Sequence, residues 1–338
     1  MLESADYLRD STEVTVDPFS DILRLANAES VVSGGFTAGG SWAIRFPAFD
    51  KLKFSALIRG ACRLLVDGEE RPVRIEAGDV ILLSVRRSFV LGSDLDLVPV
   101  EAASVFSHHV GEVVRLGGGD ECLQIGGFIR LDPASGGLLS DVLPPLIHVR
   151  AASPRATVLR WLLDQLVHER VAELPGASLA SAQLAQLLFI QILRAHLEAS
   201  GDLAAGWLRA LGDQGIAPAL RLMHGDPARS WKLEELAKAA AMSRTTFMVR
   251  FRSAAGVPPL TYLLHWRMRL AERALRSKDL PMSDLALSLG YTSESAFSHA
   301  FKRIVGMAPK RYRDAARKQD LDGPGRNERR ARSHSRKQ

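Results

Sequence analysis

The sequence contains only two cysteines, Cys62 and Cys122, among 338 residues. Two thiols are too few for a disulfide framework or for a metal cage built of cysteine alone, so we expect two separate thiols. No apolar stretch reaches the roughly 20 residues that a membrane helix requires, and the acidic N-terminus lacks the basic start of a secretion signal. We therefore expect a soluble, cytoplasmic protein with no membrane partner.

Motifs of catalysis are also missing. The chain has no Gly-x-Ser-x-Gly elbow and no Cys-x-x-Cys, and Gly117-Gly-Gly119 is followed by neither Lys-Ser nor Lys-Thr, which predicts a flexible loop instead of a phosphate site. His108 and His109, followed by Glu112, form the one histidine cluster of the first half. Adjacent strand residues point to opposite faces, so a metal site here would need a further ligand such as His148. We predict no catalytic residue, no metal and no cofactor, and hence no enzyme.

Charge divides the chain into two dissimilar halves. Residues 1–200 carry 18 Lys and Arg against 25 Asp and Glu, a net charge of −7, whereas residues 201–338 carry 26 against 13, a net charge of +13. An acidic part joined to a basic part is the arrangement expected when only one of them meets a polyanion.

Residues 16–150, which follow a flexible N-terminus at 1–15, are built mainly from short apolar runs separated by glycine and charged turns. This spacing is typical of antiparallel strands, and Asp67-Gly68 supplies the positive φ angles of a hairpin turn. The pattern predicts a compact all-β barrel or sandwich. The strands are expected at Trp42–Phe46, Phe54–Ile58, Cys62–Val66, Val80–Leu83, Phe89–Leu91, Leu123–Ile125 and Phe128–Leu131.

Residues 151–213 read as a helical linker. Two helices are expected at Thr157–Glu173 and Ser178–Ala199, separated by Pro175-Gly176. Their apolar stripes are wider than covering a small barrel requires. The stripes serve either intramolecular packing or a dimer interface, and we expect a homodimer.

A repeated unit occupies residues 214–316. Leu236 matches Leu285 at an offset of 49, and at an offset of 50 the matches are Phe247/Phe297, Phe251/Phe301, Gly256/Gly306, Pro259/Pro309 and Tyr262/Tyr312. Each copy, at about 233–255 and 282–305, consists of a short helix, a turn and a longer helix that ends at glycine. This is the pattern of a helix-turn-helix. The helix at 261–275 would be a stiff spacer between the copies.

The second helix of each copy has the shape to enter a DNA major groove, and the basic charge favours DNA over a plain helical bundle. With the phenylalanines facing inward, other side chains are left to meet base edges or phosphates. The expected base readers are Arg244, Thr245, Met248, Val249, Ser295, Ser298 and His299. The expected phosphate contacts are Arg250, Arg252, Lys302, Arg303, Lys310, Arg311 and Arg313.

The basic tail at 317–338 has almost no apolar residues, so we expect disorder. It serves either as a solvated tail or as a non-specific attraction for DNA.

The repeat region resembles the AraC/XylS type of transcriptional regulator, whose signature is two helix-turn-helix units joined by one helix. Its closing motif Gly-x-x-Pro-x-x-Tyr-Arg is present here as Gly306 to Arg313, and Leu289-Gly290-Tyr291 and Ala296-Phe297-Ser298 also fit. The turn glycine of the family falls at Ala241 in the first copy. By position, the resemblance assigns base contacts to Thr245, Val249, Ser295, Ser298 and His299.

The N-terminal half is similar to the cupin-type sensor domain found in some of these regulators. Three segments carry the resemblance: Asp17–Leu23, Gly78–Leu83 and Leu143–Arg150. It implies a small barrel that binds an effector or mediates self-association. The chain departs from metal-dependent cupins because it lacks His-x-His after Gly60. The side chains considered for an effector site are Trp42, Phe46, Phe54 and Phe89.

These observations predict a multidomain α+β protein, with a cupin-like barrel, a helical linker and an all-α double helix-turn-helix domain. The leading hypothesis is a sequence-specific regulator of transcription that binds double-stranded DNA and responds to a small-molecule effector. One alternative is a DNA-binding regulator whose barrel serves only oligomerisation or contact with RNA polymerase. Another is a metal-dependent cupin enzyme fused to a DNA-binding module.

Overall fold

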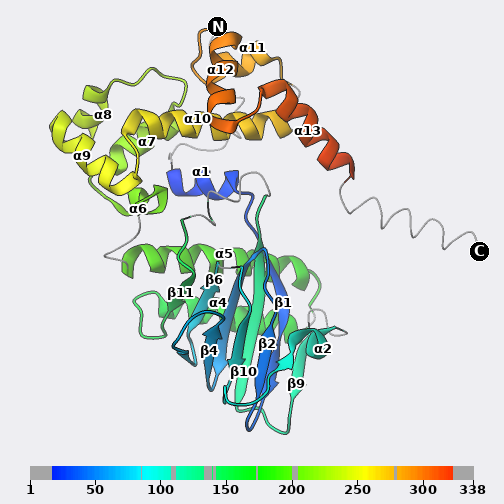
Figure 1. Cartoon of the computed structure of the whole chain (residues 1–338). Coiled ribbons are helices and arrows are strands. Elements are labelled where there is room, and N and C mark those ends of the chain that lie inside the picture. The colour runs from blue at the N-terminus through cyan, green and yellow to red at the C-terminus, as the bar shows by residue number, and fades with distance from the viewer. Residues whose placement is uncertain are drawn as a thin grey trace, which may run out of the picture. The chain divides into compact units, whose positions relative to one another are not determined.

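The computed structural model describes residues 17–84, 86–107, 112–132, 139, 142–172, 174–199, 205–277 and 280–322. The chain divides into two compact units (Figure 1). One unit is Ala26–Ala204, called here the barrel unit, and the other combines Met1–Leu25 with Ala205–Gln338 and is called the helical unit. No helix within the described residues has the length and apolar character needed to cross a membrane.

The barrel unit contains two sheets. The first has the strand order β11-β6-β3-β10-β1-β9 and the second the order β5-β4-β7-β2-β8. Most neighbouring strands are antiparallel, and β9 and β8 add in parallel at the edges. The strands are β1 (Glu29–Ala38), β2 (Ala43–Phe46), β3 (Leu52–Arg59), β4 (Ala61–Val66), β5 (Val73–Glu76), β6 (Val80–Leu83), β7 (Phe89–Gly92), β8 (Val100–Glu101), β9 (Val113–Leu116), β10 (Cys122–Arg130) and β11 (Leu146–Val149).

A continuous apolar core fills the space between the two sheets. Both sheets contribute, with Phe36 and Leu57 from one and Ile44 and Leu64 from the other. The short helix α2 (Ala102–Phe106) adds Phe106 to this core. Both cysteines belong to it, and burial raises the pKa of the Cys62 thiol to about 12 and that of Cys122 to about 11, so both thiols stay protonated and unreactive.

Two long helices complete the barrel unit. The helix α4 (Ala156–Ala172) packs on α5 (Ala177–Ala199), and α5 in turn packs against β1 and β11. A hydrogen bond from the Ser30 backbone N–H to Gln186 Oε1, 3.1 Å long, fastens α5 to the start of β1. The expected helices are confirmed to within one residue at each end.

The helical unit holds the two predicted helix-turn-helix copies. The first is α8 (Leu233–Ala239) with α9 (Arg244–Ala255), and the second is α11 (Met282–Ser288) with α12 (Glu294–Val305). Between them runs α10 (Pro259–Ser277), as Figure 1 shows. The remaining helices are α1 (Pro18–Leu25), α6 (Trp207–Gly212), α7 (Ala217–Gly225) and α13 (Pro309–Asp322).

The structure corrects the predicted composition of the two parts. Residues 18–25 were expected in the barrel, but they form the amphipathic helix α1, which packs on α7 and α10 of the helical unit. The helix α6 was expected in the linker and packs on α9 instead. A buried apolar face explains both placements, since Ile22 and Leu25 of α1 and Trp207 and Leu208 of α6 are buried.

Local predictions also differ from the structure. The strands β1, β5, β8, β9 and β11 were not expected. The glycines and serines of β1 weaken its strand pattern, and β11 follows Pro144-Pro145. The expected pair at 123–125 and 128–131 is the single strand β10, since Gly126 and Gly127 lie within the ladder. The helix α13 continues to Asp322, past the predicted start of the disordered tail at 317; the rest of the tail lies outside the described residues.

Candidate nucleic-acid interface and barrel interior

The two helix-turn-helix copies are built alike. Ser243 and Ser293, 50 residues apart, each cap the second helix by accepting a hydrogen bond on Oγ from a backbone N–H three residues on, at 3.2 and 3.1 Å. At the other end of each helix, Gly256 and Gly306 adopt left-handed conformations with φ of 78° and 81°, which confirms the predicted glycine ends. The caps fix the length and start of α9 and α12.

The aromatic contacts inside each copy are also repeated. Phe247 and Phe251 pack with ring centroids 5.5 Å apart, and Phe251 lies edge-on to Tyr262 at 5.6 Å. In the second copy, Phe297, Phe301 and Tyr312 repeat this chain at 5.7 and 5.6 Å. All four phenylalanines are fully buried. The inward face of each second helix is therefore fixed, and its opposite face is presented to solvent.

The residues expected to read bases lie on these solvent faces. In α9, Met248 is 43% exposed and Val249 is 67% exposed, which is unusual for large apolar side chains. Arg244 is also exposed, and its guanidinium lies 3.1 Å from Glu234 of α8. Thr245, Ser295 and His299 are exposed, and Ser298 is half-buried.

Two of the seven expected phosphate contacts have partners within the protein. Arg250 donates hydrogen bonds from Nε and Nη2 to the carboxylate of Asp213, at 2.7 to 3.0 Å. Burial raises the pKa of Asp213, but the hydrogen bonds from Arg250 and from the Gly215 N–H outweigh it and hold that pKa below its usual range. Arg313 donates from Nη2 to the Leu280 carbonyl at 2.6 Å, tying α13 to the start of the second copy.

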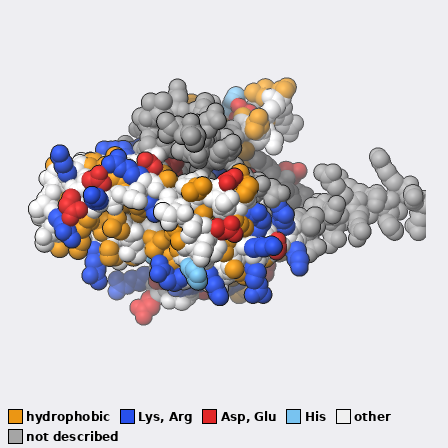
Figure 2. All heavy atoms as spheres, turned by 90° about the horizontal axis from the view of Figure 1, so that it is seen from above, with side chains coloured by type: hydrophobic (Ala, Val, Ile, Leu, Met, Phe, Trp, Pro, Cys, Tyr) orange, Lys and Arg blue, Asp and Glu red, His pale blue; other side chains and the backbone are white. Residues whose placement is uncertain are grey.

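The other five expected phosphate contacts are exposed, so a polyanion can reach their side chains. The face displayed in Figure 2 shows Lys and Arg side chains gathered along its lower margin, with apolar side chains between them. A groove of about 610 Å³ beside α9 is lined by Thr245, Val249 and Arg250, together with Arg209 and Asp213. The exposed cations are Arg252, Lys302, Arg303, Lys310 and Arg311.

The helix α1 is anchored by a buried polar group. The imidazole of His224 in α7 is fully buried, with Nδ1 3.3 Å from Asp21 Oδ2 of α1 and Nε2 2.9 Å from the Tyr262 hydroxyl of α10. The His224 ring also stacks on Trp266 with centroids 4.1 Å apart. Burial lowers the pKa of His224, and the Asp21 carboxylate acts in the opposite direction. One histidine thus joins α1 to the helices that carry the first copy.

In the barrel interior, three of the four side chains considered for an effector site come together. Trp42, Phe46 and Phe89 belong to the core between the sheets, and Phe46 stacks on Phe89 with centroids 4.7 Å apart. Phe54 lies elsewhere, on the opposite face of β3, where its ring fills the space beside Gly127. Successive side chains of a strand point to opposite faces, so Phe54 points away from the core that contains Trp42, Phe46 and Phe89.

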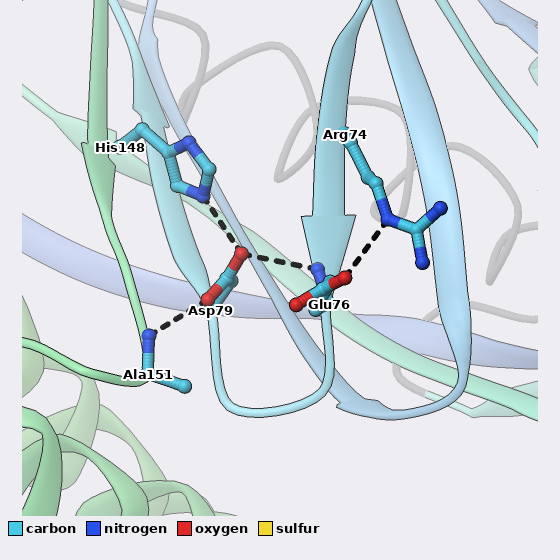
Figure 3. Close-up of polar contacts among 5 residues, drawn as sticks. All are labelled: Arg74, Glu76, Asp79, His148 and Ala151. Atoms are coloured by element: carbon cyan, nitrogen blue, oxygen red, sulfur yellow. Dashed lines mark hydrogen bonds and ion pairs between the residues drawn. The ribbon is translucent and has the colours of Figure 1, made fainter.

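Two of the segments similar to cupin sensors meet at one buried carboxylate. Asp79 Oδ2 accepts hydrogen bonds from the Glu76 N–H at 3.0 Å and lies 2.8 Å from His148 Nε2, while Oδ1 accepts from the Ala151 N–H at 2.7 Å (Figure 3). Both carboxylate oxygens of Asp79 thereby have partners. The arrangement holds the β5–β6 turn to the end of β11, which is a structural task.

The histidine cluster considered for a metal site lies only partly within the described residues. His108 and His109 lie outside the described residues, Glu112 is exposed, and His148 contacts Asp79. Among the described residues, no three His, Cys, Asp or Glu side chains gather closely enough to hold a metal ion.

Comparison with known proteins identifies both parts of the chain. A family described as cupin matches residues 17–198, and a family described as helix-turn-helix domain matches residues 236–315. A putative AraC-like transcription regulator of Streptomyces antibioticus is 43% identical over 298 residues, covering 88% of this chain and 98% of its own length. The HTH-type transcriptional regulator AlkR of Acinetobacter baylyi is 31% identical, covering 81% of this chain and 91% of its own length.

A solved structure is similar to the C-terminal part. The DNA-binding domain of the global transcriptional factor AdpA, determined in complex with a target DNA, is 32% identical, covers 33% of this chain and all of its own length, and gives a TM-score of 0.31.

Proposed function

Since this chain belongs to the AraC-like family of DNA-binding transcription regulators with an N-terminal cupin domain, we propose that it recognises its operator by placing α9 and α12 in successive major grooves. The observation that carries the proposal is the repeated construction of two solvent-facing second helices on either side of α10. This helix has 19 residues, about 28 Å at 1.5 Å per residue. That length suits two major grooves about one helical turn apart on one face of the duplex.

We assign base reading to the exposed faces of the two helices. Val249 has no hydrogen-bonding group and is two-thirds exposed, so it suits contact with a thymine methyl group. His299 and Ser295 offer donors and acceptors for base edges in the second groove. The exposed cations of α9, α12 and α13 would hold phosphates, which fixes the register of the protein on the duplex without reading sequence.

The test is selection of bound sequences from random duplex DNA by the full-length protein near physiological salt. Two enriched boxes about one helical turn apart are expected. Thr245→Ala should change the preferred bases in one box only, and His299→Ala in the other only. Arg311→Ala should weaken binding to all sequences alike and reduce the salt slope by about one unit. Similar losses on selected and random DNA for all three variants would contradict the assignment of readers.

We further propose that the barrel binds a small-molecule effector and that α1 carries the signal to the DNA-binding helices. Only three residues, Ala26, Asn27 and Ala28, separate α1 from β1 of the barrel. Displacement of β1 would therefore pull on a helix that is anchored at His224 beside the first helix-turn-helix copy. An effector acts by shifting the population of the DNA-competent arrangement.

A substitution that weakens the packing of α1 is expected to change the affinity for DNA, although α1 contains none of the residues assigned to base reading. Asp21→Ala removes the acceptor beside the buried His224, while Ser20→Ala is a matched control because the Ser20 hydroxyl donates to Asp17 at the start of the same helix. The affinity for the selected operator, measured by fluorescence anisotropy with full-length protein, should change about threefold or more in the first variant and stay nearly constant in the second. Equal affinities in wild type and both variants would remove α1 from the signalling route.

We also propose that α4 and α5 pair two copies of the chain. Large apolar side chains are exposed along both helices, Val158 and Trp161 one turn apart on α4 and Leu179 on α5, and Trp161 is 55% exposed. Exposed patches of this kind mark interaction surfaces. The alternative is that the barrel surface contacts RNA polymerase, but the adjacent exposed Val158 and Trp161 on α4 favour a second copy.

Disruption of this face should convert dimer to monomer. Trp161→Asp is expected to raise the dimer dissociation constant about a hundredfold, as measured by sedimentation equilibrium. Arg63→Asp, an exposed position on β4 in the sheet that α5 does not cover, serves as the control and should leave the dimer intact. A wild-type protein that sediments as a monomer at micromolar concentration would contradict pairing through these helices.

A further inference from the structure

The barrel interior contains a continuous series of aromatic side chains. Neighbouring ring centroids lie between 4.7 and 6.2 Å apart along the order Trp42, Phe36, Phe106, Phe46, Phe89 and Phe49. Phe89 and Phe36 are fully buried, whereas Phe49 is only partly buried. The series thus runs through the core, and Phe106 and Phe49 are its two partly buried rings.

A lysine ends this series. Lys53 lies on β3 directly opposite Leu83 of β6, a core residue, so both side chains point to the interior face of the sheet. The Lys53 Nζ lies 4.0 Å from the ring centroid of Phe46, 5.2 Å from that of Phe89 and 5.7 Å from that of Phe49. Three aromatic rings therefore surround one ammonium group.

No carboxylate within the described part of the chain forms an ion pair with Lys53. Burial lowers the pKa of its ammonium group to about 8, because nothing nearby replaces the lost hydration with negative charge. Attraction to aromatic faces offsets only part of the lost hydration of an ammonium group. An apolar side chain would fill this position at lower cost, so the ammonium group needs a reason other than folding.

We propose that Lys53, Phe46, Phe49 and Phe89 form the effector site and that the effector is a small arylcarboxylic acid. Its carboxylate would pair with the Lys53 Nζ, supplying the missing negative charge in a poorly hydrated setting where such a pair is strong. Its ring would extend the aromatic series, in which edge-on and stacked contacts stabilise each added ring. This inference rests on the proposal that the barrel binds an effector.

The experiment compares an acid with its neutral analogue. Binding of 4-phenylbutyrate and of 4-phenylbutanamide to the full-length protein is measured by isothermal titration calorimetry near pH 7. The acid is expected to bind about tenfold tighter than the amide or better, since only the acid pairs with the ammonium. Lys53→Met should reduce the affinity for the acid to that for the amide, and Lys53→Arg should keep most of the preference.

Lys51→Met is the matched control. Lys51 lies two residues before Lys53, just ahead of β3, and its Nζ also lies over an aromatic ring, that of Phe128 at 4.5 Å, but it is exposed. This variant should bind the acid as the wild type does. Equal affinity for acid and amide, an unchanged preference in the Lys53→Met variant, or failure of arylcarboxylates of shorter and longer chain to bind would overturn the proposed site.

The two proposals fail in different ways. If the neutral amide binds as well as the acid and changes operator affinity, the barrel is an effector domain but the carboxylate site is wrong. If the acid binds through Lys53 but operator affinity stays constant, the site stands and its role in regulation is lost. Operator affinity with and without each compound is therefore measured on the same protein samples.

Discussion

Replacement of Gly290 by alanine should lower the free energy of unfolding of the helical unit by about 3–5 kcal/mol. Gly290 forms the turn between α11 and α12 with φ of +79°, a conformation that costs a residue with a side chain about 1–2 kcal/mol. A Cβ there would lie 1.9 Å from the Ala228 carbonyl oxygen, so the backbone must also move. We expect the second copy to loosen and its box to disappear from the selected operator.

The first copy provides the matched variant. Its turn has Ala241 where the second has Gly290, and Ala241 is held at φ of 52°. Ala241→Gly should therefore gain up to about 1 kcal/mol, because glycine adopts this conformation without strain, although its more flexible unfolded chain offsets part of the gain. Urea unfolding followed by circular dichroism measures both variants. A stabilising Gly290→Ala, or an Ala241→Gly as harmful as Gly290→Ala, would contradict this account of the turn.

The helix-turn-helix domain was predictable because its rules are local and occur twice. The capping serines, the terminal glycines and the inward phenylalanines lie within single helices, so spacing in the sequence determines their spacing in space. Because the two copies match at an offset of 50 residues, each position predicted in one copy can be compared with its counterpart in the other. The backbone strain at Ala241 could also be expected, because alanine occupies the position where the family has its turn glycine.

Long-range partners could not be predicted in the same way. Asp213 lies 37 residues from Arg250, and Asp21 lies 203 residues from His224. Nothing in either local sequence identifies its partner, so Arg250 read as a free phosphate contact and α1 as part of the barrel. An amphipathic period over residues 18–25 was the one signal that could have revealed α1 as a helix.

The sequence does not mark Lys53 as an interior residue, because the apolar run of this strand begins at Phe54 and leaves the lysine at its edge. In an alternating strand, one face contains residues 53, 55 and 57 and the other contains 52, 54 and 56. Leu57 belongs to the core between the sheets, whereas Phe54 does not, so Lys53 lies on the face of β3 that points into that core. Phe54 was considered for the effector site on its aromatic character alone, and the structure places its ring beside Gly127, on the face of β3 opposite to that of Lys53.

Lys53→Met is expected to stabilise the barrel unit although it abolishes the preference for an acid. The pKa of the buried ammonium group is lowered from 10.5 to about 8. Below pH 8 the ammonium is charged in the folded and the unfolded chain, so folding bears the cost of removing it partly from water. Methionine has a similar length and no charge, so the variant should gain about 1–3 kcal/mol near pH 7.

The stability gained by Lys53→Met should decrease as the pH rises. Between pH 8 and 10.5 the folded wild type is increasingly neutral while its unfolded chain still binds the proton, so wild-type stability rises relative to the variant. The difference in unfolding free energy between the two proteins should therefore shrink above pH 8 and vanish near pH 10.5, as followed by urea unfolding at each pH. Lys51→Met, at an exposed position, should show no such trend. A Lys53→Met protein that is less stable than the wild type at pH 7 would mean that the ammonium group stabilises the fold. A more stable Lys53→Met protein is the expected result. It means that the wild-type barrel keeps an ammonium group that destabilises it, and binding of an anion is the physical reason.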